Sequence, residues 1–252
     1  MDTLNEYGNQ QIHLYLLSII DDVDKCCREH NIKYSLSGGT LLGAVRDKGY
    51  IPWDDDMDIM FDRRNYYKFL RAYKKYMSDD YKIVGKSWVK RITKKDNPDM
   101  DKELGCIDLF VFDPVPESRL AAKVKVLMLK FLQGMLKDNN DYSSFSPLYR
   151  VLLFVTWAVG RLFSKRTKLR WYSRLSKWSG FSDDYSFVNI YNTWFDQIGR
   201  LRFEKEVISG YTDVDFEGRR FMSISGYDRY LTVLYGDYMT PPEQKDRKPM
   251  HR

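Results

Sequence analysis

The spacing of apolar residues predicts a regular series of helices and strands over the first 112 residues. Ile12, Leu16, Ile20 and Cys27 recur at helical spacing, so we expect an amphipathic helix over 9–29. By the same reasoning, shorter helices are predicted at 40–46 and 66–76, and strands at 32–36, 57–61, 81–84, 88–93 and 106–112. This order is typical of a small mixed α/β fold.

Beyond Pro116 the pattern changes. One helical stripe is apolar and another face is basic; the apolar members are Leu120, Val124, Leu127, Phe131 and Met135, and the basic ones are Lys123, Lys130 and Lys137. A loop over 138–146 precedes a second apolar and basic stretch, 148–178, and residues 181–215 are aromatic and irregular. We therefore divide the chain into a core at 1–116, a basic amphipathic helical insertion at 117–180 and a C-terminal segment at 181–252.

Charge is distributed unevenly along the chain. The chain has 252 residues and a net charge of +6, yet residues 118–178 contain 13 Lys and Arg against two Asp, so that the rest of the chain carries −5. A segment that is both basic and apolar fits the surface of an anionic membrane better than nucleic acid. The alternative is an ordinary core with solvated lysines. The longest apolar run of the chain, 151–159, is much shorter than the roughly 20 residues that span a bilayer.

The cysteines indicate the cellular compartment of the protein, and the histidines bear on which catalytic chemistry it could use. The three cysteines, Cys26, Cys27 and Cys106, form no disulfide framework or Cys-x-x-Cys pair, which indicates a reducing compartment. Because residues 1–11 are polar and acidic, we expect no secretory signal. We predict a cytoplasmic protein that lies peripherally on the inner membrane face. The histidines, His13, His30 and His251, accompany no matching Ser or Cys motif and are interpreted as surface residues.

An acidic run at 54–58 enters a buried strand and suggests a metal site. In an extended chain Asp54, Asp56 and Asp58 share one face, where two carboxylates about 5 Å apart repel by roughly 3 kcal/mol at an effective dielectric near 20. A hard divalent cation relieves this repulsion. The spacing does not match an EF-hand loop, because Ile59 stands where glycine is required. The alternative is a solvated acidic turn that caps the following helix.

Two further features lie near the acidic run in the predicted fold. Asp108 is the only charge within the apolar strand Cys106–Phe112, and burial of a lone carboxylate requires a partner or a metal. The pair Gly38-Gly39 stands between a strand and a helix, where backbone N–H groups can approach an anion. The pair is part of neither a P-loop nor a dinucleotide fingerprint. An anion-binding glycine turn beside a cation site is the arrangement expected for binding a phosphate together with its metal ion.

The amino-acid sequences of three segments resemble those of the LicD family, which includes the fukutin-related proteins. The segments are "GGTLLGAVRDKGYIPWDDDMDI", "GCIDLFVFDPVP" and "FEGRRFMSISGYDRYLTVLYGDYMTPP". The resemblance implies an α+β fold with a polymerase-β-type nucleotidyltransferase core, in which a small mixed sheet is flanked by helices. It identifies 1–116 as the nucleotidyltransferase-like catalytic core and 181–252 as the segment that completes the active site. It also implies transfer of a phosphorylated alcohol, usually phosphocholine, from a CDP-activated donor such as CDP-choline. The acceptor is a hydroxyl of a cell-surface glycan, such as lipopolysaccharide or teichoic acid, or of its lipid-linked precursor.

The resemblance assigns roles to specific residues. The family's catalytic metal triad maps onto Asp56, Asp58 and Asp108, which would hold Mg²⁺ or Mn²⁺. Asp108 or a neighbouring Asp would accept the proton of the acceptor hydroxyl. For the donor we expect contacts from Gly38, Gly39, Thr40, Arg46, Trp53 and Asp54. Trp53 or Tyr50 could lie over a quaternary ammonium group, and core packing is the alternative for both, as a surface position is for Arg46.

Two other functions remain open from the sequence. One is a glycosyltransferase that uses the Asp-x-Asp motif to bind a nucleotide sugar, and it differs in forming a glycosidic bond rather than a phosphodiester. The other is a non-catalytic scaffold associated with the membrane.

Overall fold

The chain folds into two compact units, and the second interrupts the first in sequence. The computed structural model describes residues 7–85, 88–97, 104–136, 147–179, 185–188 and 202–247. The first unit comprises 1–84, 89–112 and 203–252, and the second comprises 85–88 and 113–202.

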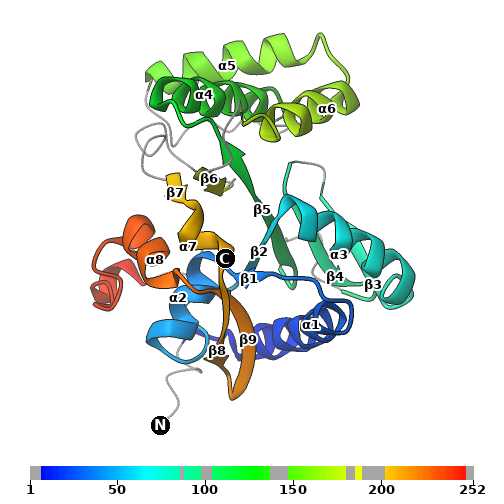
Figure 1. Cartoon of the computed structure of the whole chain (residues 1–252), viewed down its shortest axis with the longest axis vertical. Helices are drawn as coiled ribbons and strands as arrows, with labels where there is room; N and C mark the ends of the chain where they lie inside the picture. The colour runs from blue at the N-terminus through cyan, green and yellow to red at the C-terminus, as the bar shows by residue number, and fades with distance from the viewer. Residues whose placement is uncertain are drawn as a thin grey trace. The chain divides into compact units, whose positions relative to one another are not determined.

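The first unit combines a sheet, a separate hairpin and surrounding helices (Figure 1). Its helices are α1 (Gln10–Glu29), α2 (Gly38–Arg46), α3 (Arg63–Tyr76), α7 (Lys205–Ser209), α8 (Tyr227–Tyr235) and the 3-10 turn η4 (Gln244–Asp246). Its strands are β1 (Ser35–Leu36), β2 (Met57–Asp62), β3 (Tyr81–Val84), β4 (Lys90–Lys94), β5 (Ile107–Val115, which continues into the second unit), β7 (Arg202–Glu204), β8 (Tyr211–Phe216) and β9 (Arg219–Ile224).

The sheet is mixed, with strands in the order β1-β2-β5-β4-β3. The central pair, β2 and β5, is parallel, and every other neighbouring pair in this order is antiparallel. Both central strands read as apolar runs, because the two faces of a central strand are buried. The predicted α+β class with a small mixed sheet flanked by helices is confirmed.

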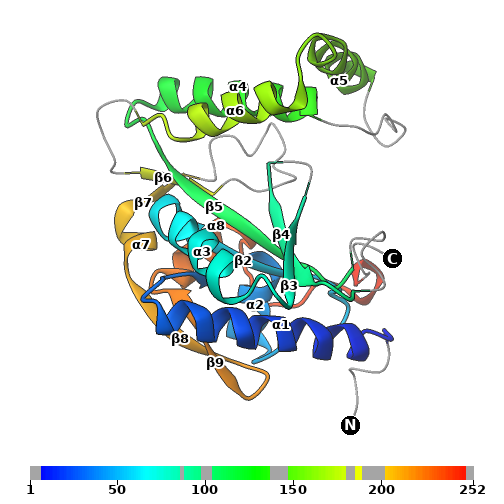
Figure 2. The ribbon, with the colours of Figure 1, turned by 90° about the vertical axis from the view of Figure 1, so that its right-hand side faces the viewer.

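Helices α1 and α3 form where the apolar periodicity predicts them. The buried face of α1 includes Leu16, Ile20 and Val23, and in Figure 2 the helix passes below β3 and β4. Helix α3 begins directly after β2, because the Asp62 side chain accepts a hydrogen bond from Asn65 N at 2.7 Å. The N-cap of α3 is thus Asp62, so helix capping does not account for the acidic run at 54–58.

The C-terminal part of the first unit is a hairpin followed by a helix. Strands β8 and β9 are joined by Glu217 and Gly218, whose φ values of +51° and +70° are those of a tight hairpin turn. Glu217 Oε1 accepts a hydrogen bond from Tyr50 N at 3.0 Å, and Ile224 N donates to Ser35 Oγ at 3.0 Å. The hairpin therefore fixes both the loop before the acidic run and strand β1.

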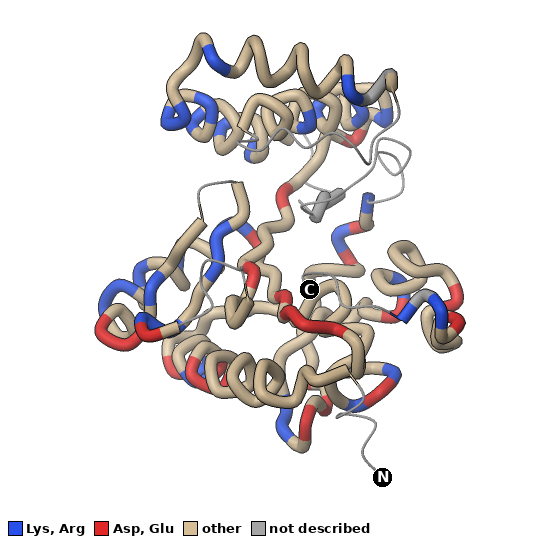
Figure 3. The backbone as a smooth tube through the Cα atoms, turned by 180° about the vertical axis from the view of Figure 1, so that it is seen from behind, with Lys and Arg blue, Asp and Glu red and all other residues tan. Residues whose placement is uncertain are grey.

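The second unit is mainly helical. It contains α4 (Arg119–Leu136), α5 (Pro147–Gly160), α6 (Lys165–Ser176) and the short strand β6 (Tyr185–Val188). In Figure 3 these helices carry Lys and Arg but no Asp or Glu. None of the helices within the described ranges is long and apolar enough to cross a membrane.

A buried lysine holds α4 and α6 together. Lys125 is fully buried, and its Nζ donates to the carbonyl oxygens of Pro114 at 2.5 Å, Ser176 at 2.7 Å and Trp178 at 2.7 Å. Two of these oxygens lie at and beyond the end of α6, where carbonyls lack helical partners. The ammonium group therefore satisfies three backbone acceptors that no apolar side chain could satisfy.

Several predicted boundaries were wrong. The strand expected at 32–36 is only β1 (Ser35–Leu36), and β5 extends past Pro114 to Val115, beyond the end of its pairing with β2 at Phe112. Part of the irregular stretch expected at 181–215 forms α7 and β8, and the expected loop at 138–146 lies outside the described residues. On α4, Leu120 and most of its apolar stripe are exposed, whereas Lys125 is buried.

We predict that Lys125→Met destabilises the protein by about 3 kcal/mol, because three buried carbonyls lose their donor. Urea unfolding followed by far-UV circular dichroism measures this change. Lys123→Met is the matched control, since Lys123 is exposed on the same helix, and we expect its effect to stay within about 0.5 kcal/mol. Equal effects of the two substitutions would contradict the assigned role of Lys125.

Candidate active site

The sheet brings two of the predicted carboxylates side by side. Asp58 is the second residue of β2 and is paired in register with Asp108 of β5. Because neighbouring strands lie about 4.8 Å apart and paired residues point to the same face, both carboxylates lie on one face of the sheet. Asp56 immediately precedes β2, and Asp54 precedes it by two residues. The structure therefore places Asp58, the last residue of the acidic run, next to Asp108.

The turn between β1 and α2 lies against these carboxylates. A Cβ atom on Gly38 would lie 2.7 Å from Asp58 Oδ2, and one on Gly39 would lie 2.5 Å from Asp54 Oδ2. Gly38 also has φ +53°, which favours glycine. Both positions therefore favour glycine, because a side chain at either one would have to displace a carboxylate oxygen.

The backbone of Asp58 is bound on both sides by the same turn. Ser37 N donates to Asp58 O at 3.0 Å, and Asp58 N donates to Thr40 Oγ1 at 2.9 Å. Thr40 is buried. Its hydroxyl, predicted to bind a phosphate, thus positions Asp58 in this structure.

The site concentrates negative charge. The pKa of the Asp58 carboxyl is raised well above its ordinary value, first because the protein shields it from water and next because Asp56 and Asp108 are negatively charged. The pKa of Asp54 is raised for the same first reason and then by Asp56 and Asp55. In both cases burial and neighbouring negative charges destabilise the ionised carboxylate. A cation bound nearby would stabilise the ionised form.

Arg91 supplies a positive charge that was not predicted from the sequence. Arg91 lies opposite Asp108 in the antiparallel β4–β5 pair, and its Nε donates to Asp108 Oδ1 at 2.6 Å. Both side chains are mostly shielded from water, and Arg91 lowers the pKa of Asp58. The register of β4 against β5 creates this pair, and no local sequence pattern reveals that register.

Three side chains far from the acidic run in sequence support its backbone and the glycine turn. His13 Nε2 lies 2.7 Å from Asp54 O, so it carries the proton, since a carbonyl oxygen can only accept. Asn9 Nδ2 donates to the same oxygen at 3.1 Å. The hydroxyl oxygen of Tyr230, on α8, lies 3.0 Å from Ser37 Oγ, within hydrogen-bonding distance. Burial raises the pKa of the Tyr230 hydroxyl to about 12.

The prediction that the histidines are surface residues was wrong for His13. His13 is buried and stacks on Tyr50 with ring centroids 4.0 Å apart, and Tyr50 also packs edge-on against Phe216. Tyr50 is therefore a core residue rather than part of a ligand site. His251 lies outside the described residues.

Arg46 and Trp53 have protein partners in this structure. The Arg46 guanidinium pairs with Asp47, with Nη2 and Oδ2 2.8 Å apart. The Trp53 ring lies edge-on to Tyr7 at 6.1 Å, and the Arg247 guanidinium lies 5.2 Å from its centroid. A cation over this indole demonstrates that the ring face can accept one.

The oxygen donors suit a hard divalent cation, although they do not form a closed coordination shell. Within the described ranges, no three Asp, Glu, His or Cys side chains converge closely enough to hold a metal ion. Asp56, Asp58 and Asp108 nevertheless offer only carboxylate oxygens, which Mg²⁺ prefers. Their mutual repulsion, seen in the raised pKa of Asp58, is what a bound dication would relieve.

Comparisons with known proteins found one matching family model and several similar proteins. Residues 31–127 match the family model described as LicD/FKTN/FKRP, nucleotidyltransferase domain. The lipopolysaccharide cholinephosphotransferase LicD of Haemophilus influenzae is 29% identical to this chain, over 94% of each protein. An uncharacterized protein of Rickettsia prowazekii is 48% identical over 52 residues, which cover 21% of this chain and 19% of that protein. An uncharacterized protein of Rickettsia typhi is 50% identical over 46 residues, which cover 18% and 15% respectively.

We predict that Gly38→Ala destabilises the protein by about 2 kcal/mol more than Gly218→Ala does. Of these two glycines, Gly38 faces a carboxylate and Gly218 does not. Gly218 has φ +70° with no atom within 4 Å of the added Cβ, so its substitution reports the backbone cost alone, about 1 kcal/mol. Urea unfolding of the two variants measures the difference. Equal costs would mean that Asp58 moves aside freely.

Proposed function

Because this chain belongs to the LicD family of phosphotransferases, we propose that it transfers phosphocholine, or a similar phospho-alcohol, from a CDP-activated donor to a glycan hydroxyl. The observation that carries the proposal is the register pairing of Asp58 with Asp108 beside the glycine turn. The name of the Haemophilus influenzae relative supports phosphocholine as the group and lipopolysaccharide as the first acceptor to try. Family membership favours phosphotransfer over the glycosyltransferase and scaffold alternatives.

The proposed reaction exchanges one bond to phosphorus for another. The acceptor hydroxyl oxygen forms a bond to the phosphorus that carries the alcohol, the bond from that phosphorus to the CMP oxygen breaks, and CMP leaves. The hydroxyl proton passes to a carboxylate, which we assign to Asp108 or a neighbouring Asp. Asp56, Asp58 and Asp108 would hold Mg²⁺ or Mn²⁺, which when bound neutralises charge on the leaving CMP.

The remaining site residues orient the donor in this proposal. The glycine turn at the N-terminus of α2 exposes backbone close to the carboxylates, which is where the phosphates of a metal-bound diphosphate would lie. Arg91 is near enough to Asp108 to add a second positive charge for these phosphates. Trp53, which already has a guanidinium over its ring, is the candidate for the quaternary ammonium of choline. Release of Arg46 from Asp47 would free a further phosphate ligand.

We predict that Asp58→Asn reduces CMP release from CDP-choline by at least about 10³-fold, in a reaction with a lipopolysaccharide acceptor and Mg²⁺. The same substitution should stabilise the protein in chelator by about 1 kcal/mol, because it removes one of the crowded charges. Chromatographic detection of CMP and thermal unfolding measure the two effects. Asp79→Asn is the control, since Asp79 is exposed and outside the site.

A phosphocholine-modified acceptor, identified by mass spectrometry, supports the proposed donor and acceptor. CMP release that persists undiminished in chelator would exclude the metal, and full activity of Asp58→Asn would exclude the site itself. Thermal stabilisation by a small set of CDP-alcohols would identify the preferred alcohol.

We propose further that the protein is cytoplasmic and attaches peripherally to the inner membrane face, where a lipid-linked acceptor precursor would be available. The support is the second unit, whose helices α4, α5 and α6 contain nine Lys and Arg besides the buried Lys125, and no Asp or Glu. Such a surface is attracted to anionic lipids, each basic residue contributing roughly 1 kcal/mol close to the membrane.

The purified protein should sediment with liposomes that contain phosphatidylglycerol and remain in solution with purely zwitterionic liposomes. Because the attraction is electrostatic, we expect about 1 M NaCl to release most of the bound protein. Retention that is independent of both lipid charge and salt would contradict this mode of attachment.

A further inference from the structure

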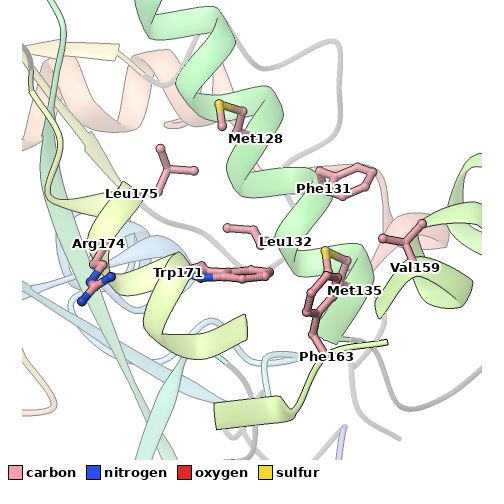
Figure 4. Close-up of a pocket in the computed structure, with 9 residues that line it drawn as sticks. All are labelled: Met128, Phe131, Leu132, Met135, Val159, Phe163, Trp171, Arg174 and Leu175. Carbon is pink, nitrogen blue, oxygen red and sulfur yellow. The ribbon is translucent and has the colours of Figure 1, made fainter. Parts of the chain in front are cut away.

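The helical unit contains an apolar pocket that the proposed reaction does not use. The pocket has a volume of about 570 Å³, which is within the range of roughly 300–1,000 Å³ typical of small-molecule sites. Met128 and Phe131 of α4 form one wall, Trp171 and Leu175 of α6 form another, and Phe163 stands at one end (Figure 4). Figure 4 shows the Trp171 indole pointing from α6 towards Phe163.

The helices around the pocket are fixed, so the space cannot simply collapse. Helices α4 and α5 cross so closely that a Cβ on Gly134 would lie 2.4 Å from Thr156 Oγ1, and one on Gly160 would lie 2.6 Å from Met135 O. Helices α4 and α6 are joined through Lys125, through Lys168 Nζ to Met135 O at 2.8 Å, and through a Gln133–Tyr172 hydrogen bond at 3.1 Å. These contacts fix the positions of α4, α5 and α6 relative to one another, so the helices that line the pocket cannot easily move inward to fill it.

The pocket opens onto an exposed apolar surface. Met128, Phe131, Phe163 and Trp171 line the pocket and are also exposed, at 37% to 51%. The surface continues along the α4 stripe to Leu120, with further exposed apolar side chains on α5 and in the turn after it; these include Val151, Phe154 and Leu162. Apolar patches of this kind mark a binding surface for a partner or a membrane.

Charge complementarity identifies the partner as an anionic amphiphile. Arg174 is the one charged residue among those that line the pocket, and in Figure 4 its guanidinium lies at one edge and points away from the apolar side chains. The three helices that form the unit carry positive charge alone. A second copy of this chain, packed through the same face, would bring like charges together and is disfavoured. A lipid with a long chain and a negative headgroup matches both the apolar walls and the basic surround.

We infer that the pocket binds one acyl chain of an anionic membrane phospholipid, while Arg174 and the surrounding basic residues contact its headgroup. This inference goes beyond the phosphotransferase reaction and uses none of its residues. Insertion of a chain into a formed pocket would hold the protein at a defined depth, which electrostatic adsorption alone does not.

Binding of lysophosphatidylglycerol, below the concentration at which it forms micelles, tests the inference on the full-length protein. We expect saturable binding of one molecule per chain, with quenching of tryptophan fluorescence when the acyl chain is brominated. Trp171→Phe should remove most of the quenching, because Trp171 lines the pocket.

Phe131→Asp should weaken binding at least about tenfold, because it places a charge in the apolar wall. Met128→Glu provides a second variant, and both side chains are exposed enough at 40% and 51% for the fold to tolerate the change. Leu120→Asp is the matched control, since it adds the same charge to the same stripe outside the pocket, and we expect less than a twofold effect. Thermal unfolding verifies that all variants are folded.

The headgroup contribution is measured with an uncharged monoacylglycerol of the same chain length. We expect it to bind about fivefold more weakly than lysophosphatidylglycerol, and Arg174→Gln to remove most of this difference. Asp58→Asn should bind lysophosphatidylglycerol like the wild type, so failure of the lipid site and failure of the proposed reaction give different results.

Three outcomes would overturn the inference. These are an absence of saturable binding, equal weakening by Leu120→Asp and Phe131→Asp, and a concentration-dependent dimer in which Phe131→Asp abolishes association but leaves lipid quenching unchanged. The last would assign the surface to a second copy of this chain.

Discussion

The backbone of the glycine turn lies directly against the carboxylates of Asp54 and Asp58. A side chain at Gly38 or Gly39 would displace a carboxylate oxygen, so both positions favour glycine. The parallel pairing of β2 with β5 places Asp58 beside Asp108, where like charges repel. The fold thus maintains an arrangement that is unfavourable in itself, which is common at functional sites and rare elsewhere.

The cost of this crowding is offset by contacts from distant parts of the first unit. Arg91 neutralises part of the charge on Asp108, and His13 and Asn9 bind the backbone of Asp54. Tyr230 fixes Ser37 at the start of the glycine turn. Each partner acts on backbone or charge that the acidic run and the turn cannot satisfy locally, so the site is a property of the whole unit.

Local patterns were sufficient to predict β2, β5 and the helices α1, α2 and α3, but not the β8–β9 hairpin or α8. The apolar periodicity located α1 and α3, and the lone charge of Asp108 in an apolar strand identified it as a partner of the acidic run. Arg91 and Tyr230 could not be found in this way, because their positions depend on the β4–β5 register and on the packing of α8. These depend on contacts between residues far apart in the sequence.

The helical unit demonstrates a different limit of periodicity. A 3.6-residue repeat predicts that α4 is a helix with an apolar stripe, but it does not say whether that stripe faces a core. Leu120 and Phe131 are exposed, while Lys125 is buried because three carbonyl oxygens surround its ammonium group. A lysine reads as a surface residue in any sequence pattern, and only the tertiary arrangement of chain ends makes it a core residue.

The contributions of the β8–β9 hairpin and of Tyr230 have a consequence for biosynthesis. Ribosomes make a chain from its N-terminus, so Gly38 to Asp58 emerge long before the residues that anchor them, Glu217 and Tyr230. During that interval the acidic segment lacks part of its scaffold and the intervening helical unit has already been made. The nascent polypeptide therefore acquires a competent centre only when translation is nearly complete.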